Sequence, residues 1–297
     1  MITPTEQRNP RTLAIDALGT TEILQLVNAE DARVAGAVGA VLPEMAHAVD
    51  AAVQAVRSGG RVHYFGAGTS GRLAVLDAAE LLPTFHAPDD LVVAHHAGGT
   101  AALLRAVENV EDSEEGGAAD AADVTGVDIV IGLTASGSTP YVAGALRAAR
   151  AVGATTALIT SNPSAPLAAL ADIVIAADTG PEVIAGSTRL KAGTAQKMIL
   201  NSFSTTLMIK LGRTWSNLMV DMVATNNKLR GRVLRILAEA TGANPEACVA
   251  ALAAADGELK PALVHLLSGS PVSEARAALD EAGGRVAVAL GKLGASA

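Results

Sequence analysis

The sequence predicts an α/β protein with a doubly wound parallel sheet of about five strands, flanked by helices, and a small helical region at the C-terminus. Between residues 61 and 177, short apolar runs rich in Val and Ile alternate with segments of helical periodicity. This strand-helix rhythm is typical of a parallel sheet covered on both faces. After residue 241 the chain is rich in alanine and shows only short helical patterns, which indicates the helical region.

The elements follow in a regular order along the chain. Residues 5–20 are polar and irregular, and residues 21–58 have helical spacing, with a break near residues 28–31 and an end at Gly59-Gly60. Strands are expected at 61–66, 91–96, 127–133, 154–160 and 172–177. Helices are expected at 70–82, 100–124, 139–152 and 164–171. Apolar residues then recur at three- and four-residue spacing through 190–241, which predicts long helices.

The turn-forming stretch Thr241-Gly-Ala-Asn-Pro245 separates these long helices from the short ones that follow. We therefore expect two domains. Residues 1–240 form the sheet domain with an N-terminal helical extension, and residues 241–297 form a small helical domain.

Composition excludes several classes of protein. The net charge is −8, no block of Lys and Arg occurs, and the 297 residues include only one Trp, two Tyr and three Phe. Nucleic acid is therefore not an expected partner. Cys248 is alone, so no internal disulfide can form. No apolar stretch reaches membrane-spanning length and the first ten residues lack an apolar core, so we expect a cytoplasmic protein that does not bind a membrane.

One local pattern occurs twice in the predicted sheet. Residues 61–76 (RVHYFGAGTSGRLAVL) and 127–142 (DIVIGLTASGSTPYVA) each contain a strand, a turn of Gly, Ser and Thr, and the start of a helix. The unpaired N–H groups and the dipole of a helix N-terminus favour an anion. Two such turns on neighbouring strands predict one shared site for a compact phosphate. Its candidate ligands are Gly68, Thr69, Ser70, Ser136, Ser138 and Thr139.

Two other interpretations of the first turn are less well supported. GAGTSG at 66–71 fits the G-x-G-x-x-G pattern of dinucleotide-binding proteins. That pattern requires an acidic residue at the end of the next strand, but this strand ends in His95 and His96. A tight turn with glycines needed only for packing would not explain the second hydroxyl-rich turn.

A third segment has similar residue types. In residues 181–197 (PEVIAGSTRLKAGTAQK), Ser187 and Thr188 precede a predicted helix that carries Lys191. A Ser or Thr here is often only a helix cap. Two hydroxyls and a mobile cation at a helix N-terminus would also suit a sugar or a phosphate.

The carboxylates are ambiguous from spacing alone. Glu80 lies late in an apolar helix, where it either reaches solvent or is half-buried, with a raised pKa that suits a general acid. The acidic run from Glu108 to Glu115 is interpreted mainly as a solvated surface, and spacing does not single out one member. The histidines lack the spacing of a metal site, so no metal is expected.

Several blocks in order along the chain resemble one known family. TEQRNPRT, GAGTSGRLAVLDAAE, AVENVED, TASGSTPYV, PEVIAGSTRLKAGTAQK and NLMVDMVATNNKL are similar to N-acetylmuramic acid 6-phosphate etherases, within the sugar isomerase (SIS) superfamily. The resemblance implies a phosphosugar-binding sheet and cleavage of the D-lactyl ether at C3 of N-acetylmuramic acid 6-phosphate, in recycling of peptidoglycan. It also implies a homodimer, no metal and no organic cofactor.

By this resemblance, Glu80 stands at the general-acid glutamate of the family, and Glu111 stands at its second catalytic glutamate. The chain departs from the family pattern at two places. Leu81 and Leu82 replace the usual Cys-Pro, and Ser138 replaces the usual Arg, which removes a cation near the phosphate.

Two other functions remain open from the sequence. A sugar-phosphate isomerase on the same fold would also exploit the acidity of the C2 proton. A phosphosugar sensor without activity is the other alternative, although no DNA-binding motif accompanies the sheet and both glutamates are present. Release of D-lactate would distinguish the etherase from both.

Overall fold

The computed structural model describes residues 3–105, 107–221 and 227–295, with only the backbone described for 227–230. The chain divides into two compact units. The first comprises residues 1–80 and 88–204, and the second comprises residues 81–87 and 205–297.

The first unit is built on a parallel sheet of five strands, as predicted. The strands are β1 (Val62–Gly66), β2 (Val92–His96), β3 (Ile129–Leu133), β4 (Thr155–Thr160) and β5 (Ile173–Ala176). Their order across the sheet is β2-β1-β3-β4-β5. β1 and β3 are buried along their whole length, which agrees with their continuous apolar sequences.

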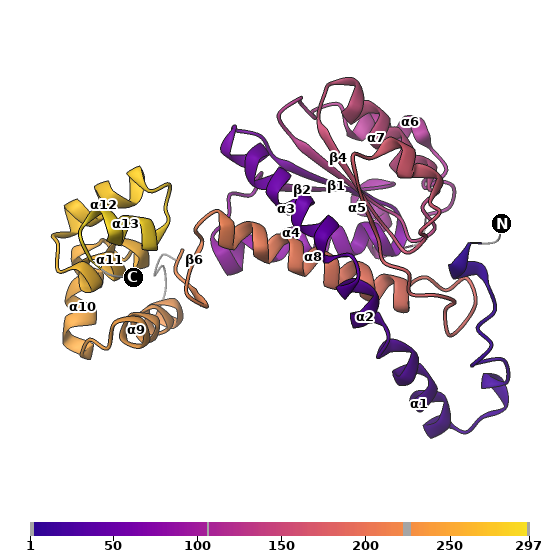
Figure 1. Cartoon of the computed structure of the whole chain (residues 1–297), viewed down its shortest axis with the longest axis horizontal. Coiled ribbons are helices and arrows are strands. Elements are labelled where there is room, and N and C mark those ends of the chain that lie inside the picture. Colours follow the sequence, from indigo (N-terminus) through magenta and orange to yellow (C-terminus); the bar gives the residue numbers. More distant parts are fainter. Residues whose placement is uncertain (1–2, 106, 222–226, 296–297) are drawn as a thin grey trace. The chain divides into compact units, whose positions relative to one another are not determined.

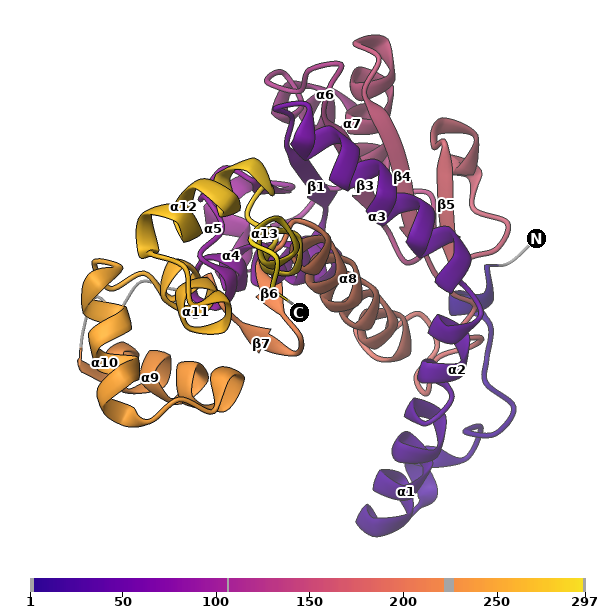
Figure 2. The ribbon, with the colours of Figure 1, turned by 60° about the vertical axis from the view of Figure 1, so that its left-hand side comes forward.

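Helices pack on both faces of this sheet (Figures 1 and 2). α3 (Leu42–Arg57) contacts β1, β3 and β5, whereas α7 (Pro140–Ala151) contacts β1, β3 and β4 and packs against α6 (Glu114–Asp120). Side chains of β1 alternate between the two faces. Tyr64 lies against Phe203, with ring centres 6.3 Å apart, and Phe65 stacks on His95, with ring centres 4.2 Å apart.

The first unit contains further helices. They are the α-helices α1 (Thr20–Asp31), α2 (Val34–Gly39) and α5 (Gly99–Leu104), most of α4 (Gly68–Phe85) and of α8 (Lys191–Lys210), and the 3-10 helices η1 (Pro4–Glu6), η2 (Ile15–Ala17) and η3 (Pro166–Leu170).

The expected helix over 100–124 is wrong as a single element. α5 ends at Leu104, and α6 begins only at Glu114, where the Ser113 hydroxyl accepts a hydrogen bond from the Gly116 N–H. Asn109 has a φ of 64°, a left-handed conformation that a helix cannot include. The segment between the two helices carries Glu111.

In the second unit, the described residues form helices and one short hairpin. The expected long helices of 190–241 are interrupted by β6 (Thr214–Trp215) and β7 (Leu218–Met219), which pair antiparallel. Gly212 follows α8 with a φ of 78°, a conformation that ends a helix. The remaining helices are α9 (Asn227–Thr241), α10 (Pro245–Ala254), α11 (Leu259–Ser268), α12 (Val272–Glu281) and α13 (Val286–Lys292).

The two compact units divide within α8, whereas the sequence places the boundary near residue 240. α9 packs against α10 and α11, and its buried Val233 and Leu237 belong to the apolar core of the C-terminal helices. An unbroken helical pattern in the sequence therefore does not reveal the division. Among the described residues, no helix is long and apolar enough to span a membrane.

Candidate active site

The two hydroxyl-rich turns lie at the point where the strand order reverses. From β1 the chain moves to β2 on one side of the sheet, and then to β3 on the other side. In parallel α/β sheets, ligands bind outside the carboxyl ends of the strands at such a switch point. The first loop (residues 66–71) follows β1 and the second loop (residues 134–139) follows β3, so the topology brings both predicted turns to this edge.

The first loop is a tight turn in which Gly66 and Gly71 leave no room for a side chain. A Cβ on Gly71 would lie 2.5 Å from the carbonyl oxygen of Gly66 and 2.6 Å from the His96 ring. Nε2 of His96 lies 3.3 Å from the carbonyl oxygen of Gly68, which has a φ of 53°. The loop therefore holds its N–H groups at the start of α4 in one fixed arrangement.

The N-terminal half of α8 lies against this first loop. A Cβ on Gly193 would be 3.5 Å from the methyl carbon of Thr69 and 3.3 Å from the carbonyl oxygen of Thr188. Three residues further along α8, the amide oxygen of Gln196 accepts a hydrogen bond of 2.9 Å from the Ser70 hydroxyl. Gln196 is not among the site residues predicted from the sequence. The sequence offers one indication of its role: Gln196 lies three residues after Gly193, and residues at this spacing share one face of a helix.

The hydroxyls of the second loop form a connected network. Oγ1 of Thr134 lies 2.7 Å from Oγ1 of Thr139, and Oγ of Ser136 lies 3.0 Å from Oγ of Ser138. The Gly137 N–H donates to Thr134 Oγ1. Ser138 is exposed, whereas Ser136 and Thr139 are half-buried. The outer hydroxyls therefore remain accessible to an anion.

Groups from β4 and the following turn fix the second loop in place. The Asn162 amide donates to the carbonyl oxygen of Ser136 at 2.8 Å, and the Thr160 hydroxyl donates to that of Ala135 at 3.2 Å. Gly137 has a φ of 76°, and a Cβ there would lie 2.3 Å from the Cβ of Ala165. Only glycine fits this position.

Hydrogen bonds link α4 to α5, which precedes the Glu111 segment, and link α7 to Glu111 itself. The Arg72 guanidinium, one residue after the first loop, donates to the carbonyl oxygens of Ala102 at 2.7 Å and Leu103 at 2.8 Å. The Tyr141 N–H, two residues after the second loop, donates to the carbonyl oxygen of Glu111 at 3.0 Å. The structure therefore brings the backbone of Glu111 beside the second loop. The Glu111 side chain is exposed.

Glu80 lies on α4, far along the helix from the loop at which that helix begins. Ten residues separate it from Ser70, which corresponds to about 15 Å at a rise of 1.5 Å per residue. Its side chain is exposed in the single chain. One turn earlier, Asp77 is buried and accepts hydrogen bonds from the hydroxyls of Tyr64 and Ser204. Burial raises the pKa of Asp77, and these two donors oppose that effect.

The third hydroxyl segment differs from the sequence-based expectation. Lys191 is fully buried, and its Nζ lies 2.6 Å from a carboxylate oxygen of Glu30, so it is not a mobile cation. The buried carboxylate of Glu182 accepts from the N–H groups of Lys191 and Ala192, each at 2.9 Å. The N-terminus of α8 therefore already has an internal anion. Ser187 and Thr188 are half-buried and precede this helix.

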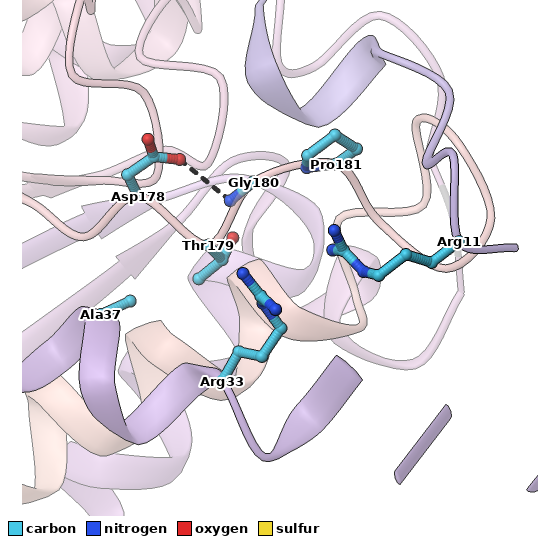
Figure 3. Close-up of a pocket in the computed structure, with 7 residues that line it drawn as sticks. All are labelled: Arg11, Arg33, Ala37, Asp178, Thr179, Gly180 and Pro181. Carbon is cyan, nitrogen blue, oxygen red and sulfur yellow. Dashed lines mark hydrogen bonds between the residues drawn. The ribbon is translucent and has the colours of Figure 1, made fainter. Parts of the chain in front are cut away.

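Two cavities lie elsewhere in the first unit. One of about 390 Å³ is beside the end of β5, where Arg11 and Arg33 extend toward Thr179 and Pro181 (Figure 3). The other, of about 340 Å³, lies between the N-terminal segment and residues 183–185. Neither is lined by a residue of the two loops. Arg11 also donates two hydrogen bonds to Glu30, so its charge is already compensated.

Comparisons with known proteins agree with this arrangement. Residues 44–150 match the family model "Glucokinase regulatory protein N-terminal SIS domain", and residues 99–205 match the model "SIS domain". The chain is 62% identical over 265 residues to an N-acetylmuramic acid 6-phosphate etherase of Thermobifida fusca, covering 89% of this chain and 87% of the relative. It is 51% identical to an etherase of that name from an Enterobacter strain, covering 96% of this chain and 97% of the relative.

The chain belongs to the N-acetylmuramic acid 6-phosphate etherase family. A solved structure of a phosphoheptose isomerase from Francisella tularensis is 20% identical, with a TM-score of 0.53, and it covers 65% of this chain and 100% of its own. This likeness supports the SIS fold alone.

The structure also places the residues at which the resemblance predicts a departure from the family pattern. Ser138 lies on the exposed rim of the second loop. Leu81 and Leu82 lie on α4, which continues through Pro83 to Phe85. Leu81 is buried, whereas the side chain of Leu82 is exposed.

Proposed function

We propose that this protein cleaves the D-lactyl ether of N-acetylmuramic acid 6-phosphate, giving N-acetylglucosamine 6-phosphate and D-lactate in amino-sugar recycling of peptidoglycan. The observation that supports the proposal is an identity of 62% to a relative named for this activity. In addition, both hydroxyl-rich loops follow adjacent strands at the switch point of the sheet, and the Glu111 carbonyl oxygen accepts from the Tyr141 N–H just after the second loop.

The 6-phosphate is bound between the two loops. Its ligands are the N–H groups and hydroxyls of Gly68, Thr69, Ser70, Ser136, Ser138 and Thr139. The helices α4 and α7 begin at these loops, so their dipoles favour the anion. Each hydrogen bond to a charged phosphate contributes about 1.5–3 kcal/mol. Ser187 and Thr188 extend the site toward the sugar, because the Thr188 carbonyl oxygen and the Thr69 methyl carbon both lie near the position that a Cβ on Gly193 would take.

Elimination is the accessible route, because an ether oxygen is a poor leaving group for direct displacement by water. When the sugar ring opens, C1 becomes an aldehyde and the proton on C2 becomes acidic. Glu111 removes this proton, and Glu80 protonates the departing lactyl oxygen. Water then adds to C3 of the unsaturated aldehyde. The steps require only proton transfers and water, so the proposal includes neither a metal nor an organic cofactor.

A second copy of the chain supplies Glu80. The separation of about 15 Å between Ser70 and Glu80 along α4 exceeds the distance between the phosphate and the C3 ether oxygen of one hexose. Glu80 therefore does not reach the sugar bound at its own first loop. We propose a homodimer in which the long helices pack against each other and Glu80 enters the neighbouring site. We also propose that the enzyme acts in the cytoplasm.

Separate substitutions test the two glutamates. Glu80→Gln and Glu111→Gln should each reduce kcat by about 10²- to 10⁴-fold, the usual contribution of general acid-base catalysis. In D₂O, the Glu80→Gln variant should still exchange the C2 proton while releasing little D-lactate, and Glu111→Gln should lose both. The exposed Glu115, in the same acidic run, provides a control as Glu115→Gln. The opposite exchange pattern would reverse the two roles.

Mixed dimers test the shared site. A dimer of one Glu80→Gln chain and one Glu111→Gln chain contains one intact site if Glu80 acts across the interface. Mixing the two inactive variants under conditions that exchange subunits should therefore restore D-lactate release. If both glutamates act within one chain, mixing restores nothing. Isomerisation of the phosphosugar without lactate from the wild-type protein would refute the etherase function itself.

A further inference from the structure

Gln196 combines full burial with an incomplete set of hydrogen bonds. Its side chain is 1% exposed, and its amide oxygen accepts from the Ser70 hydroxyl. Its amide nitrogen Nε2 is buried and has no partner among the described residues. A primary amide offers two donors and one acceptor, so both donors are unused here. Buried polar groups without partners are rare in native proteins, and those that occur often have a functional role.

The hydrogen bond that the Ser70 hydroxyl donates to Gln196 conflicts with phosphate binding by the same hydroxyl. A hydroxyl has one hydrogen to donate, and a phosphate oxygen can only accept. Ser70 donates its hydrogen to Gln196, so it cannot at the same time donate to an anion in the first loop. Ser70 becomes a phosphate ligand through its hydroxyl only if its bond with Gln196 is reversed.

A half-turn of the Gln196 amide produces this reversal. After it, Nε2 donates to Ser70 Oγ, and the Ser70 hydrogen is free to point into the loop. The half-turn thus replaces two unpartnered N–H groups by one unpartnered N–H group and one unpartnered carbonyl oxygen, and proteins tolerate the latter more readily. Both unusual features of Gln196 are thus explained by an exchange between a ligand-free and a ligand-bound arrangement.

We propose that Gln196 is a positioning residue for the substrate phosphate, which turns the Ser70 hydroxyl from the protein toward the ligand. This inference rests on the proposed phosphosugar function and deepens it. Gln196 acts through Ser70, because its own polar atoms are buried. It also assigns a functional role to the part of α8 that lies beside the first loop.

Other contacts already attach α8 to the body of the first unit. The Ser204 hydroxyl donates to the buried Asp77 at 2.9 Å, and Phe203 lies against Tyr64. The backbone N–H groups at the start of α8 are bound by Glu182. The Ser70–Gln196 bond is therefore not required to hold the helix in place.

Two near-isosteric substitutions separate this role from a purely structural one. In Gln196→Glu, the carboxylate accepts the Ser70 hydrogen permanently and cannot donate in return. KM for the phosphosugar should rise ten- to a hundred-fold, the loss expected for one hydrogen bond to a charged group, with kcat within about twofold. In Gln196→Met, Ser70 is free to face the ligand but is no longer held in that orientation, so KM should rise only about three- to tenfold.

A structural role predicts the reverse order. If the Ser70–Gln196 bond serves only to brace the loop, Glu preserves it and Met removes it, so Met should be the more damaging substitution. That ranking would overturn the proposal. Melting temperatures of both variants show that they fold. Gln54→Glu, an exposed position on α3, controls for the added charge.

A double-mutant cycle with Ser70→Ala separates hydroxyl orientation from simple charge repulsion. If Gln196→Glu acts through Ser70, it should raise KM by less than about threefold when Ser70 is already alanine. If the new carboxylate only repels the phosphate, its effect should be the same in both backgrounds, and the proposal fails.

Binding of inorganic phosphate distinguishes failure of this inference from failure of the etherase proposal. Phosphate should raise the melting temperature of the wild type and of Gln196→Met, and raise that of Gln196→Glu far less. A protein that gives this ranking but releases no lactate refutes the etherase function and retains the role of Gln196. A protein that releases lactate but gives the reverse ranking refutes only the role of Gln196.

Discussion

The two hydroxyl loops and the third hydroxyl segment share residue types but differ in what occupies the helix N-terminus. At the loops 66–71 and 134–139, small hydroxyl residues precede α4 and α7 and no carboxylate of the chain is bonded to these helix starts among the described residues. At residues 181–191, the buried Glu182 binds the first N–H groups of α8, and Lys191 is paired with Glu30.

This difference shows that Gly, Ser and Thr before a helix predict an anion site only when no internal anion takes the place of the ligand. In the proposed site, the first two segments leave the N–H groups at the starts of α4 and α7 for a substrate. The third uses its donors and its cation to attach the N-terminal extension and α8 to the rest of the first unit. Burial raises the pKa of Glu182, and the two N–H donors oppose that effect.

The largest expected effect comes from removing the buried cation. Lys191→Met leaves the buried Glu30 with Arg11 as its remaining partner, and breaking a buried ion pair in this way costs about 3–5 kcal/mol. Urea denaturation should show this loss, while KM of the folded protein stays within about twofold. Lys197→Met, an exposed position on the same helix, is the control. A stable Lys191→Met variant with a greatly raised KM would instead make Lys191 a substrate ligand.

Acid should weaken the same pair without any substitution. The hydrogen bond from Arg11, followed by that from Lys191, lowers the pKa of Glu30 from its ordinary value of 4.5 to about 2. Below pH 4.5 the unfolded chain takes up a proton that the folded chain does not. Stability that is fully present above pH 4.5 is therefore lost as the pH falls toward 2.

Melting temperatures measured across this range should fall more steeply for the wild type than for Glu30→Gln. Titration of His63 affects the melting temperatures of the wild type and of Glu30→Gln equally. Burial lowers its pKa from 6.5 to about 4, so its contribution to stability is lost between those two values, and it is present in both proteins. Equal slopes below pH 4.5 would mean that the Glu30 pair does not stabilise the fold.

A smaller effect is expected from the second loop. Ser136→Ala removes one hydroxyl from a network that also includes Thr134 and Ser138. The loss of one hydrogen bond to phosphate, about 1.5–3 kcal/mol, should raise KM about ten- to a hundred-fold and leave kcat nearly unchanged. Ser58→Ala, at the exposed end of α3, should change neither. An unchanged KM in Ser136→Ala would place the phosphate elsewhere.

Much of the fold could be predicted because its signals are local. Each strand of the sheet is a short apolar run, and the expected bounds of β1 and β3 differ from the observed ones by no more than two residues. The hairpin β6–β7 could not be found this way. Its strands are two residues long, and the flanking segments have helical spacing, so the interruption depends on Gly212 and on tertiary packing.

The sequence predicts where the loops of the candidate site lie in the fold, but it does not predict their long-range contacts. A repeated strand-turn-helix pattern places Ser70 and Ser136 at one edge of a parallel sheet without any knowledge of packing. Glu30 lies 161 residues along the chain from its partner Lys191. Gln196 lies 126 residues from its partner Ser70. Contacts over such separations depend on how the helices pack, which residue spacing alone does not fix.

The smallest expected effect tests the rim of the second loop, where the family resemblance predicts an Arg in place of Ser138. Ser138→Arg introduces a cation at this exposed position, where a charge pair contributes about 0.2–1 kcal/mol. KM should therefore fall by up to about fivefold, and the gain should shrink as salt is added, because screening weakens exposed pairs. Ser138→Gln, which is long but neutral, should not lower KM. If Ser138→Arg leaves KM unchanged at low salt, the phosphate does not lie at this rim, and the second loop binds another part of the substrate.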